Sequence, residues 1–571
     1  MIYKSTLPEQ TIPDIDIYSF LMHDNEHNVK PTAKDTVVTI DGHSGRTLTH
    51  GQVKDLSSRL AAGWVDNVGL GPGDVVAVFA PNQYDHIVLY FSLLAARCTI
   101  TPGNPAYTED EFHHQIANSG ANTLVTVPAL LPVLLKVCDK VGLSRDRIFL
   151  FGDNQVDGCK PFYSLLPKDN NRRVSAPLNG INPAEDVAFI CYSSGTTGVA
   201  KGVTLTHRNF VGQVLINVNF DPENTHDDDV LIAFLPFYHI YGLTLSLNSY
   251  YRVMPVVVMS RFELELFCQL IERYKVTFAN IVPPIAVLLA KSPIVQKYDM
   301  SSIRTIGSGA APLGEEHIDA LTKSVPSEVR QGYGMTETTS GICIQSLSRN
   351  SPGSIGILLA NHEAKIVDEN DNELGDDQAG ELLVRGVSIM KGYLNNDEAN
   401  ANCFTKDNWM RTGDVAKFDS KTQQFYIVDR IKELIKYKGL QVAPAGKEGN
   451  SRKTCYQTNF FLSVLSELEG LLLGNSKVAD CAVVGVYDVK EATEYPRAYV
   501  VLQPGHEGST TLASEISDYI TAKVANHKKL RGGVRFVPAI PKSASGKILR
   551  KDIREWIKKE QEQEQIKAAR L

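Results

Sequence analysis

The sequence has few of the features that mark metal-binding, disulfide-linked or nucleic-acid-binding proteins. Its nine cysteines are scattered over 571 residues, form no CxxC pair and do not cluster as zinc ligands do. This pattern favours buried or free thiols in a reducing compartment. Lys and Arg number 58 against 65 Asp and Glu, so the net charge of −7 gives no reason to expect nucleic-acid binding. A locally basic site is still compatible with this balance.

Long apolar runs are also missing. The first twenty residues contain acids and prolines where a secretion signal needs an apolar core. The most apolar region, 230–251, contains Pro236, His239 and Asn248, so it is a poor membrane span and a good buried strand–loop–helix segment. We therefore expect an intracellular protein without a transmembrane segment.

The length predicts more than one domain, because a single hydrophobic core does not grow to 571 residues. Short apolar runs at 75–80, 123–127 and 186–190 alternate with amphipathic stretches through the first two thirds of the chain. This rhythm predicts an α/β fold whose strands are mostly parallel and buried.

From about residue 353 the pattern changes to strand-like runs between Gly, Asn and Asp clusters, which predicts a small β-rich subdomain over about 353–429. A basic stretch follows Asp429, and we place a domain boundary there, between 1–429 and 430–571. The C-terminal part has two expected strands and two expected helices, at 481–486, 497–502, 511–524 and 551–561.

The sharpest local motif is YSSGTTGVAKG at 192–202, which follows an apolar run. Its glycines allow a tight turn that brings backbone N–H groups to a ligand, its hydroxyls add donors without bulk, and Lys201 adds positive charge. Such a loop suits a polyphosphate, although a flexible Ser/Gly loop would look similar in isolation. It is not a Walker A loop, because Ala200 stands where that motif has Gly.

Six further motifs follow in order: FYHIYGL, SGAAPLG, QGYGMTE, RTGD, DRIKELIKYKG and PKSASGK. With the first, they make the chain resemble the adenylate-forming superfamily, which includes acyl-CoA synthetases, 4-coumarate:CoA ligases and beetle luciferases. The resemblance spans nearly the whole chain. It implies a large AMP-binding domain of α/β subdomains with the β-rich subdomain, followed by a small mobile α+β domain. It also implies an acid:CoA ligase that forms an acyl-adenylate from ATP and then transfers the acyl group to coenzyme A.

The resemblance assigns a nucleotide site. A carboxylate is a poor electrophile, and joining it to the α-phosphate brings two anions together, which calls for cations and oriented donors. Glu337 would hold Mg²⁺, Thr336 would touch the α-phosphate, and Tyr333 would stack on adenine. The nucleotide-binding residues would be Ser193, Ser194, Gly195, Thr196, Thr197, Gly198, Lys201, Gln331, Gly332, Tyr333, Gly334, Thr336, Asp414 and Arg430.

The resemblance assigns the catalytic lysine and the moving parts. Lys547 would bridge the carboxylate and the α-phosphate, while Lys436 and Gln441 would support nucleotide contacts. The small domain would turn about a hinge at Lys432 and present Lys438 and Gly439 to CoA. Without their motifs these lysines, and likewise Asp414 and Glu337, would be read as ordinary solvated or salt-bridged side chains.

The acyl pocket is likewise assigned by resemblance. His239 would gate it rather than act as a general base, although a lone His in an apolar segment is more often a hydrogen-bonded core residue. The pocket would be lined by Ile240, Tyr241, Gly307, Gly309, Ala310, Met335, Ser340 and Gly341. None of these is charged, so we expect an acid with a neutral tail, which leaves aryl, fatty and natural-product acids open.

One segment departs from the family pattern. Residues 446–466 lie between Ala445 and Glu467, where the pattern otherwise runs on without interruption. A tolerated surface loop is one explanation. The other is a retained 63-nucleotide (21 × 3) intron of a fungal type, because these codons can spell a donor, a branch site and an acceptor.

Two alternative functions and a cellular location are also expected from the sequence. A luciferase-like oxygenase shares the adenylation step, and a binding protein disabled by the insert is the non-enzyme alternative. The sequence ends Ala569-Arg570-Leu571, which is similar to the Ser-Lys-Leu peroxisomal address, so we expect binding to the peroxisomal import receptor, with the cytoplasm as the alternative.

Overall fold

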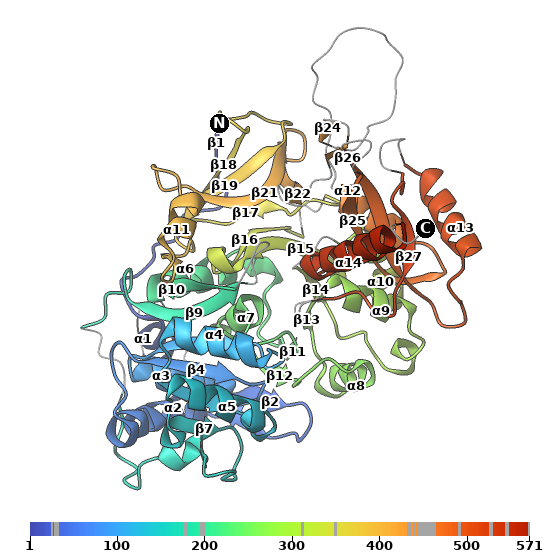
Figure 1. Ribbon diagram of the computed structural model, residues 1–571. Coiled ribbons are helices and arrows are strands. Elements are labelled where there is room, and N and C mark those ends of the chain that lie inside the picture. The colour runs from blue at the N-terminus through green and yellow to red at the C-terminus, as the bar shows by residue number, and fades with distance from the viewer. Residues whose placement is uncertain are drawn as a thin grey trace.

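The computed structural model has a large N-terminal α/β part and a small C-terminal domain, as predicted (Figure 1). It describes residues 1–23, 25, 27, 34–174, 180–193, 200–309, 313–347, 351–430, 436–437, 440–441, 464–488, 493–524, 529–542 and 548–568.

The first large sheet has the strand order β20-β10-β9-β5-β4-β6-β7-β8 among the described residues. Its core strands pair in parallel, and β9 and β10 form an antiparallel hairpin. The three expected strands are present as β4, β6 and β9. The bounds are β4 Val75–Phe79, β5 Thr99–Gly103, β6 Thr123–Thr126, β7 Ile148–Leu150, β8 Lys160–Pro161, β9 Val187–Ser193, β10 Lys201–Thr206 and β20 Gly392–Tyr393.

The second large sheet has the order β17-β16-β15-β14-β13-β11-β12-β2-β3. Strands β13, β14 and β15 run in parallel side by side, so their carboxyl ends meet at one edge. The bounds are β2 Val37–Asp41, β3 Thr47–Thr49, β11 Leu231–Ala233, β12 Val256–Val258, β13 Phe278–Ile281, β14 Thr305–Ser308, β15 Glu328–Met335, β16 Ser340–Ile344 and β17 Ile357–Leu358.

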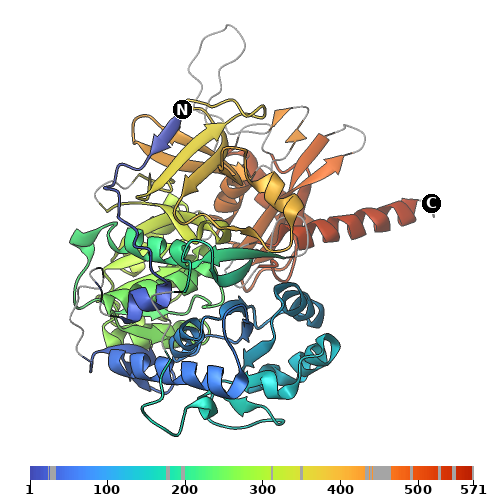
Figure 2. The same ribbon diagram turned by 90° about the vertical axis from the view of Figure 1, so that its left-hand side faces the viewer.

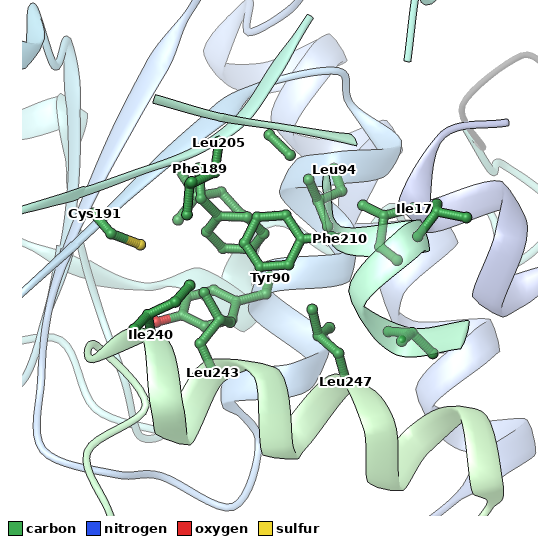
Figure 3. Close-up of a cluster of buried hydrophobic side chains, with 14 of the residues drawn as sticks. Ile17, Tyr90, Leu94, Phe189, Cys191, Leu205, Phe210, Ile240, Leu243 and Leu247 are labelled. Carbon is green, nitrogen blue, oxygen red and sulfur yellow. The ribbon is translucent and has the colours of Figure 1, made fainter. Parts of the chain in front are cut away.

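A buried helical layer packs against these sheets. Figure 3 shows Ile240, Leu243 and Leu247 on one face of a helix, turned towards Phe189 and Phe210. The expected strand–loop–helix segment at 230–251 is therefore confirmed as β11 and α7. The helices of the N-terminal part are α1 Ile17–Met22, α2 His50–Gly63, α3 His86–Ala95, α4 Glu109–Ser119, α5 Leu131–Val141, α6 His207–Val218, α7 Ile240–Arg252, α8 Leu264–Tyr274, α9 Pro283–Lys291, α10 Glu315–Ser324 and α11 Asp397–Cys403.

The start of α7 explains part of the FYHIYGL motif. The His239 ring caps the helix, because Nδ1 accepts a hydrogen bond from the backbone N–H of Tyr241 at 3.3 Å. Gly242 lies so close to the preceding turn that a Cβ there would be 2.3 Å from the carbonyl oxygen of Pro236. A larger residue would clash with this carbonyl group, so glycine is needed for α7 to begin this close to the preceding turn.

The expected β-rich region forms a third sheet, ordered β1-β18-β19-β21-β22. Its outer strand, β1, comes from the start of the chain and pairs antiparallel with β18 (Figure 2), a contact of more than 350 residues' separation that the local pattern did not predict. The last strand ends at Arg430, where we placed the domain boundary. The bounds are β1 Ile2–Lys4, β18 His362–Val367, β19 Gly380–Gly386, β21 Met410–Asp419 and β22 Gln424–Arg430.

The C-terminal domain has a separate core. A sheet ordered β25-β26-β27 carries α12 and α13 on one apolar cluster and α14 on another. All four expected elements are present, and α14 projects away from the sheet in Figure 2. The bounds are β23 Lys436–Tyr437, β24 Leu440–Gln441, α12 Val464–Leu473, β25 Val478–Asp488, β26 Thr493–Leu502, α13 Thr510–Thr521, β27 Gly533–Phe536 and α14 Arg550–Ala568.

In the part of the chain that the structure describes, no helix combines the length and the apolar character needed to cross a bilayer.

Candidate active site

Most of the described residues of the predicted site line one cavity of about 1680 Å³. Pockets for one small ligand are usually about 300–1,000 Å³, so this one has room for two. The predicted residues that line it are Ser193, Lys201, His239, Ile240, Tyr241, Gly307, Gly309, Gln331, Gly332, Tyr333, Gly334, Met335, Thr336, Glu337, Ser340, Gly341 and Asp414.

The other predicted residues fall into two groups. For Arg430, Lys436 and Gln441 the structure describes the backbone, and Lys436 pairs with Gln441 between β23 and β24. The residues outside the described ranges are Ser194, Gly195, Thr196, Thr197, Gly198, Ala310, Lys432, Lys438, Gly439, Lys547, Ala569, Arg570 and Leu571.

The phosphate end of the cavity lies between β9 and β10. Ser193 and Lys201 are register partners across this hairpin and flank the predicted phosphate loop. Helix α4 makes a hydrogen bond to the chain on each side of this loop. His114 Nε2 donates to the carbonyl of Ala200 at 2.9 Å, and the Tyr192 hydroxyl donates to Asn118 Oδ1 at 2.6 Å. His114 and Asn118 belong to none of the motifs and were not predicted, although their spacing of four residues places them on one helix face.

The carboxylate of Glu337 is buried at this end and fixed by two hydroxyl groups. Ser193 Oγ donates to Glu337 Oε1 at 3.0 Å and Tyr393 Oη donates to the same oxygen at 2.9 Å. The ammonium of Lys201 lies 3.9 Å from the centre of the Tyr393 ring. Burial, and then the neighbouring Glu337 charge, raise the pKa of Tyr393, so its hydroxyl stays a donor. Tyr393 was also missed, because only the pairing of β20 with β10 brings it here.

The Glu337 carboxylate, fixed by two hydroxyl groups, fits the predicted Mg²⁺. Among the described residues, no group of three or more His, Cys, Asp or Glu side chains could enclose a metal ion. Mg²⁺ typically needs only one or two carboxylates when phosphates complete its coordination. Glu337 therefore suits a metal that arrives with the nucleotide.

The adenosine end joins the second and third sheets. Tyr333 on β15 donates from its hydroxyl to Asp414 Oδ2, on β21, at 2.7 Å. Two hydrogen bonds hold Gln331. Its side-chain Oε1 accepts from the backbone N–H of Leu313 at 2.7 Å, and its backbone N–H donates to Gln345 Oε1 at 2.8 Å. These two hydrogen bonds fix the position of Gln331 at this end of the cavity.

The acyl end is formed by the start of α7 and the carboxyl ends of β13, β14 and β15. The predicted pocket positions are uncharged, but the cavity wall extends further than they do. It also includes the polar and charged side chains of Asp221, Asp229, Asn248, Arg252, Asn280 and Arg330. The sequence did not predict these additional wall residues, because strands and loops distant in sequence bring them to the cavity.

Among the described residues of the C-terminal domain, Lys542 and Leu549 line the cavity. Lys542 also forms an antiparallel bridge with Ile548. These residues bracket the segment 543–547, which contains Lys547. Lys542 itself is paired with Asp480 at 2.7 Å.

Comparisons with known proteins find two family models along the chain. Residues 25–394 match the family described as AMP-binding enzyme, and residues 467–547 match the AMP-binding enzyme C-terminal domain. The chain is 38% identical to 4-coumarate–CoA ligase 5 of Oryza sativa subsp. japonica, with 97% of both chains covered. It is 37% identical to 4-coumarate–CoA ligase 1 of Petroselinum crispum, with 97% of this chain and 96% of that one covered.

Two solved structures share the fold. An anthranilate CoA ligase, AuaEII, in complex with anthranoyl-AMP has a TM-score of 0.81 at 22% identity, over 96% of this chain and 98% of that one. ATP-bound MatB from Rhodopseudomonas palustris has a TM-score of 0.79 at 24% identity, over 95% and 98%.

Proposed function

The chain belongs to the AMP-binding enzyme family, and we propose that it is an ATP-dependent carboxylic acid:CoA ligase that works through an acyl-adenylate. The observation that carries the proposal is one cavity whose lining includes Ser193 and Lys201, Tyr333 and Asp414, and Tyr241 and Gly307. One bound nucleotide and one acid can therefore lie in contact.

In the first step a carboxylate oxygen of the acid attacks the α-phosphorus of ATP. The bond from that phosphorus to the oxygen bridging to the β-phosphate breaks, and pyrophosphate leaves. Lys201 and the Ser193 hydroxyl lie where they can hold the leaving phosphates, while the Tyr333–Asp414 pair provides the ribose end. Mg²⁺ bound through Glu337 would neutralise phosphate charge during this step.

In the second step the thiol sulfur of CoA attacks the acyl carbon of the adenylate. The bond from that carbon to the phosphate oxygen breaks, giving the thioester and AMP, and the thiol proton leaves to solvent or a base. His239 lines the cavity and caps α7, next to the predicted acyl-pocket residues Ile240 and Tyr241, and we assign it to gating the thiol's approach. Lys438 and Gly439 would present CoA after rotation about Lys432.

The test is a panel of carboxylic acids supplied with ATP, Mg²⁺ and CoA. We expect acid-dependent exchange of labelled pyrophosphate into ATP, and an acyl-CoA product by mass spectrometry. The relatives are named for 4-coumarate and anthranilate, so aromatic acids are the first members of the panel, with medium and long fatty acids beside them. Exchange without thioester would restrict the activity to adenylation, and neither reaction with any acid would contradict the proposal.

A location in the peroxisome is the second part of the proposal. It rests on the tripeptide Ala569-Arg570-Leu571, whose small-basic-Leu pattern fits the import receptor. A fluorescent protein fused ahead of residue 1 should be punctate in cells, and removal of Leu571 should make it diffuse. A diffuse distribution of the intact fusion, in cells that import a Ser-Lys-Leu control, would contradict it.

A further inference from the structure

Helix α4 contacts both strands at the end of the β9–β10 hairpin that faces the cavity. His114 Nε2 donates to the carbonyl of Ala200 at 2.9 Å, and the Tyr192 hydroxyl donates to Asn118 Oδ1 at 2.6 Å. Ala200 and Tyr192 belong to opposite sides of the hairpin, whereas His114 and Asn118 lie one turn apart on α4. A carbonyl oxygen can only accept a hydrogen bond, so His114 keeps a hydrogen on Nε2 whether its ring is neutral or charged.

The Tyr192 ring links these two contacts. Tyr192 is the register partner of Gly202 on β10, and a Cβ on Gly202 would lie 3.2 Å from Cζ of the tyrosine, so the ring packs closely against the neighbouring strand. The His114 ring meets it in a T-shaped arrangement, with centroids 6.0 Å apart and planes at 90°. Burial raises the pKa of the Tyr192 hydroxyl, so it stays protonated and donates to Asn118.

The end of β20 makes contacts with the same helix and hairpin. The side-chain amide of Asn395 donates to the backbone carbonyl of Asn118 at 3.3 Å, and the Leu394 N–H donates to the carbonyl of Gly202 at 2.8 Å. These residues follow Tyr393, whose hydroxyl fixes the Glu337 carboxylate. Contacts from α4 and from β20 therefore hold the end of the hairpin in place beside the carboxylate that is assigned to the metal.

We infer that His114 and Asn118 are positioning residues for adenylation, which hold Ser193 and Lys201 where these two bind the β- and γ-phosphates of ATP. Ser193 and Lys201 line the cavity, whereas neither His114 nor Asn118 is among its described lining residues, so the helix acts through the hairpin and not by touching the nucleotide. Donors that are fixed before the phosphates arrive lose less conformational freedom on binding. This inference rests on the proposed ligase function and adds two residues outside the cavity to it.

The two half-reactions separate this role from a general effect on the fold. The β- and γ-phosphates take part in the exchange of pyrophosphate into ATP, but they are absent when a supplied acyl-adenylate reacts with CoA. In the full chain, His114→Ala and Asn118→Leu should each raise the KM for ATP and for pyrophosphate by about two- to tenfold, which corresponds to the loss of one hydrogen bond. The KM for the acid, and the rate of transfer from the supplied adenylate, should stay unchanged.

His113→Ala is the matched control, because it removes the neighbouring histidine of α4, whose side chain is exposed, and should leave the KM for ATP unchanged. His114→Gln keeps an N–H donor at about the reach of Nε2 and should restore the KM at least in part. Thermal melting shows whether each variant is folded. Equal losses in both half-reactions, an unchanged KM for ATP in both His114→Ala and Asn118→Leu, or the same change in His113→Ala would overturn the inference. Absence of exchange by the unchanged protein with every acid would instead refute the proposed function.

Discussion

The Tyr333 hydroxyl donates a 2.7 Å hydrogen bond to a carboxylate oxygen of Asp414, and so ties β15 of the second sheet to β21 of the third. Asp414 is 4% exposed, which leaves its charge in a poorly solvated position facing the nucleotide end of the cavity. This pair joins the two sheets at the predicted adenosine site, and its two members should differ in importance for ATP binding.

Asp414→Asn should raise the KM for ATP about tenfold or more, since hydrogen bonds to a charged group contribute about 1.5–3 kcal/mol. Tyr333→Phe should raise it only about two- to tenfold, because it removes one hydroxyl and keeps the ring that would stack on adenine. Initial rates at varied ATP measure both. Equal effects would show that the carboxylate does not contact the ribose directly.

Tyr393→Phe should raise the Mg²⁺ concentration needed for half-maximal adenylation several-fold. The Tyr393 hydroxyl fixes Glu337 Oε1 at 2.9 Å, so its loss frees the carboxylate that is assigned to the metal. A Mg²⁺ titration of pyrophosphate exchange measures the shift. Tyr499→Phe is the control, because Tyr499 also donates to a glutamate, Glu560, but in the C-terminal domain. A similar shift in both variants would contradict the role of Tyr393.

The sequence predicted the fold class and part of the cavity lining, because both depend on local pattern and ordered motifs. Strands such as β4 and β25 are near-continuous apolar runs. It did not predict Asn280, which lies 27 residues before Gly307 and reaches it only through the register of β13 with β14. Gly307 shows the consequence: it was predicted to line the pocket, and the structure adds that the Asn280 amide occupies the space a side chain at position 307 would enter.

Asp85→Asn should stabilise the protein at neutral pH. Asp85 lies at the start of α3 and is 5% exposed, and burial raises its pKa to about 6. Between the ordinary value near 4 and 6, the folded state binds one more proton than the unfolded state, so the free energy of unfolding falls as pH rises. Asn cannot ionise, so the free energy of unfolding of the variant does not fall for this reason as pH rises. The variant should gain about 1–3 kcal/mol above pH 6 and little below pH 4.

Denaturant unfolding at pH 4 and pH 8 measures this difference. The exposed Asp110→Asn substitution, in the first turn of α4, provides the control and should change the unfolding free energy by less than about 0.5 kcal/mol. A gain for Asp85→Asn that is the same at both pH values would show that ionisation of this carboxyl is not the cause.

Lys547→Ala should reduce adenylation by about a hundred- to a thousandfold and leave transfer from a supplied acyl-adenylate to CoA much less affected. The ammonium is needed where the carboxylate meets the α-phosphate, and Lys542 and Leu549, on either side of its segment, line the cavity. The comparison is Lys542→Ala, whose ammonium is engaged with Asp480 and whose loss should cost far less. Equal losses in the two half-reactions would contradict this assignment.

The last prediction concerns residues 446–466, which we propose are a retained intron rather than a working part of the ligase. The match to the family's C-terminal domain begins at residue 467, and α12 begins only at Val464. The core residues of that helix, Leu468 and Leu472, are fully buried and lie beyond the segment. Deleting 446–466 therefore removes the first three residues of α12 but none of these core contacts, and should raise CoA transfer without lowering the melting temperature.

Deleting 446–463 keeps α12 whole, and so separates the effect of removing the segment from the effect of shortening the helix. If the segment is foreign, both deletions should raise thioester formation and leave pyrophosphate exchange nearly unchanged, because the segment follows the β23–β24 pair that is expected to face CoA. If instead it is a functional loop, both deletions should lower transfer. Sequencing of mature transcripts gives the independent test, since the presence of these 63 nucleotides in most messages would contradict the intron hypothesis whatever the enzyme assays show.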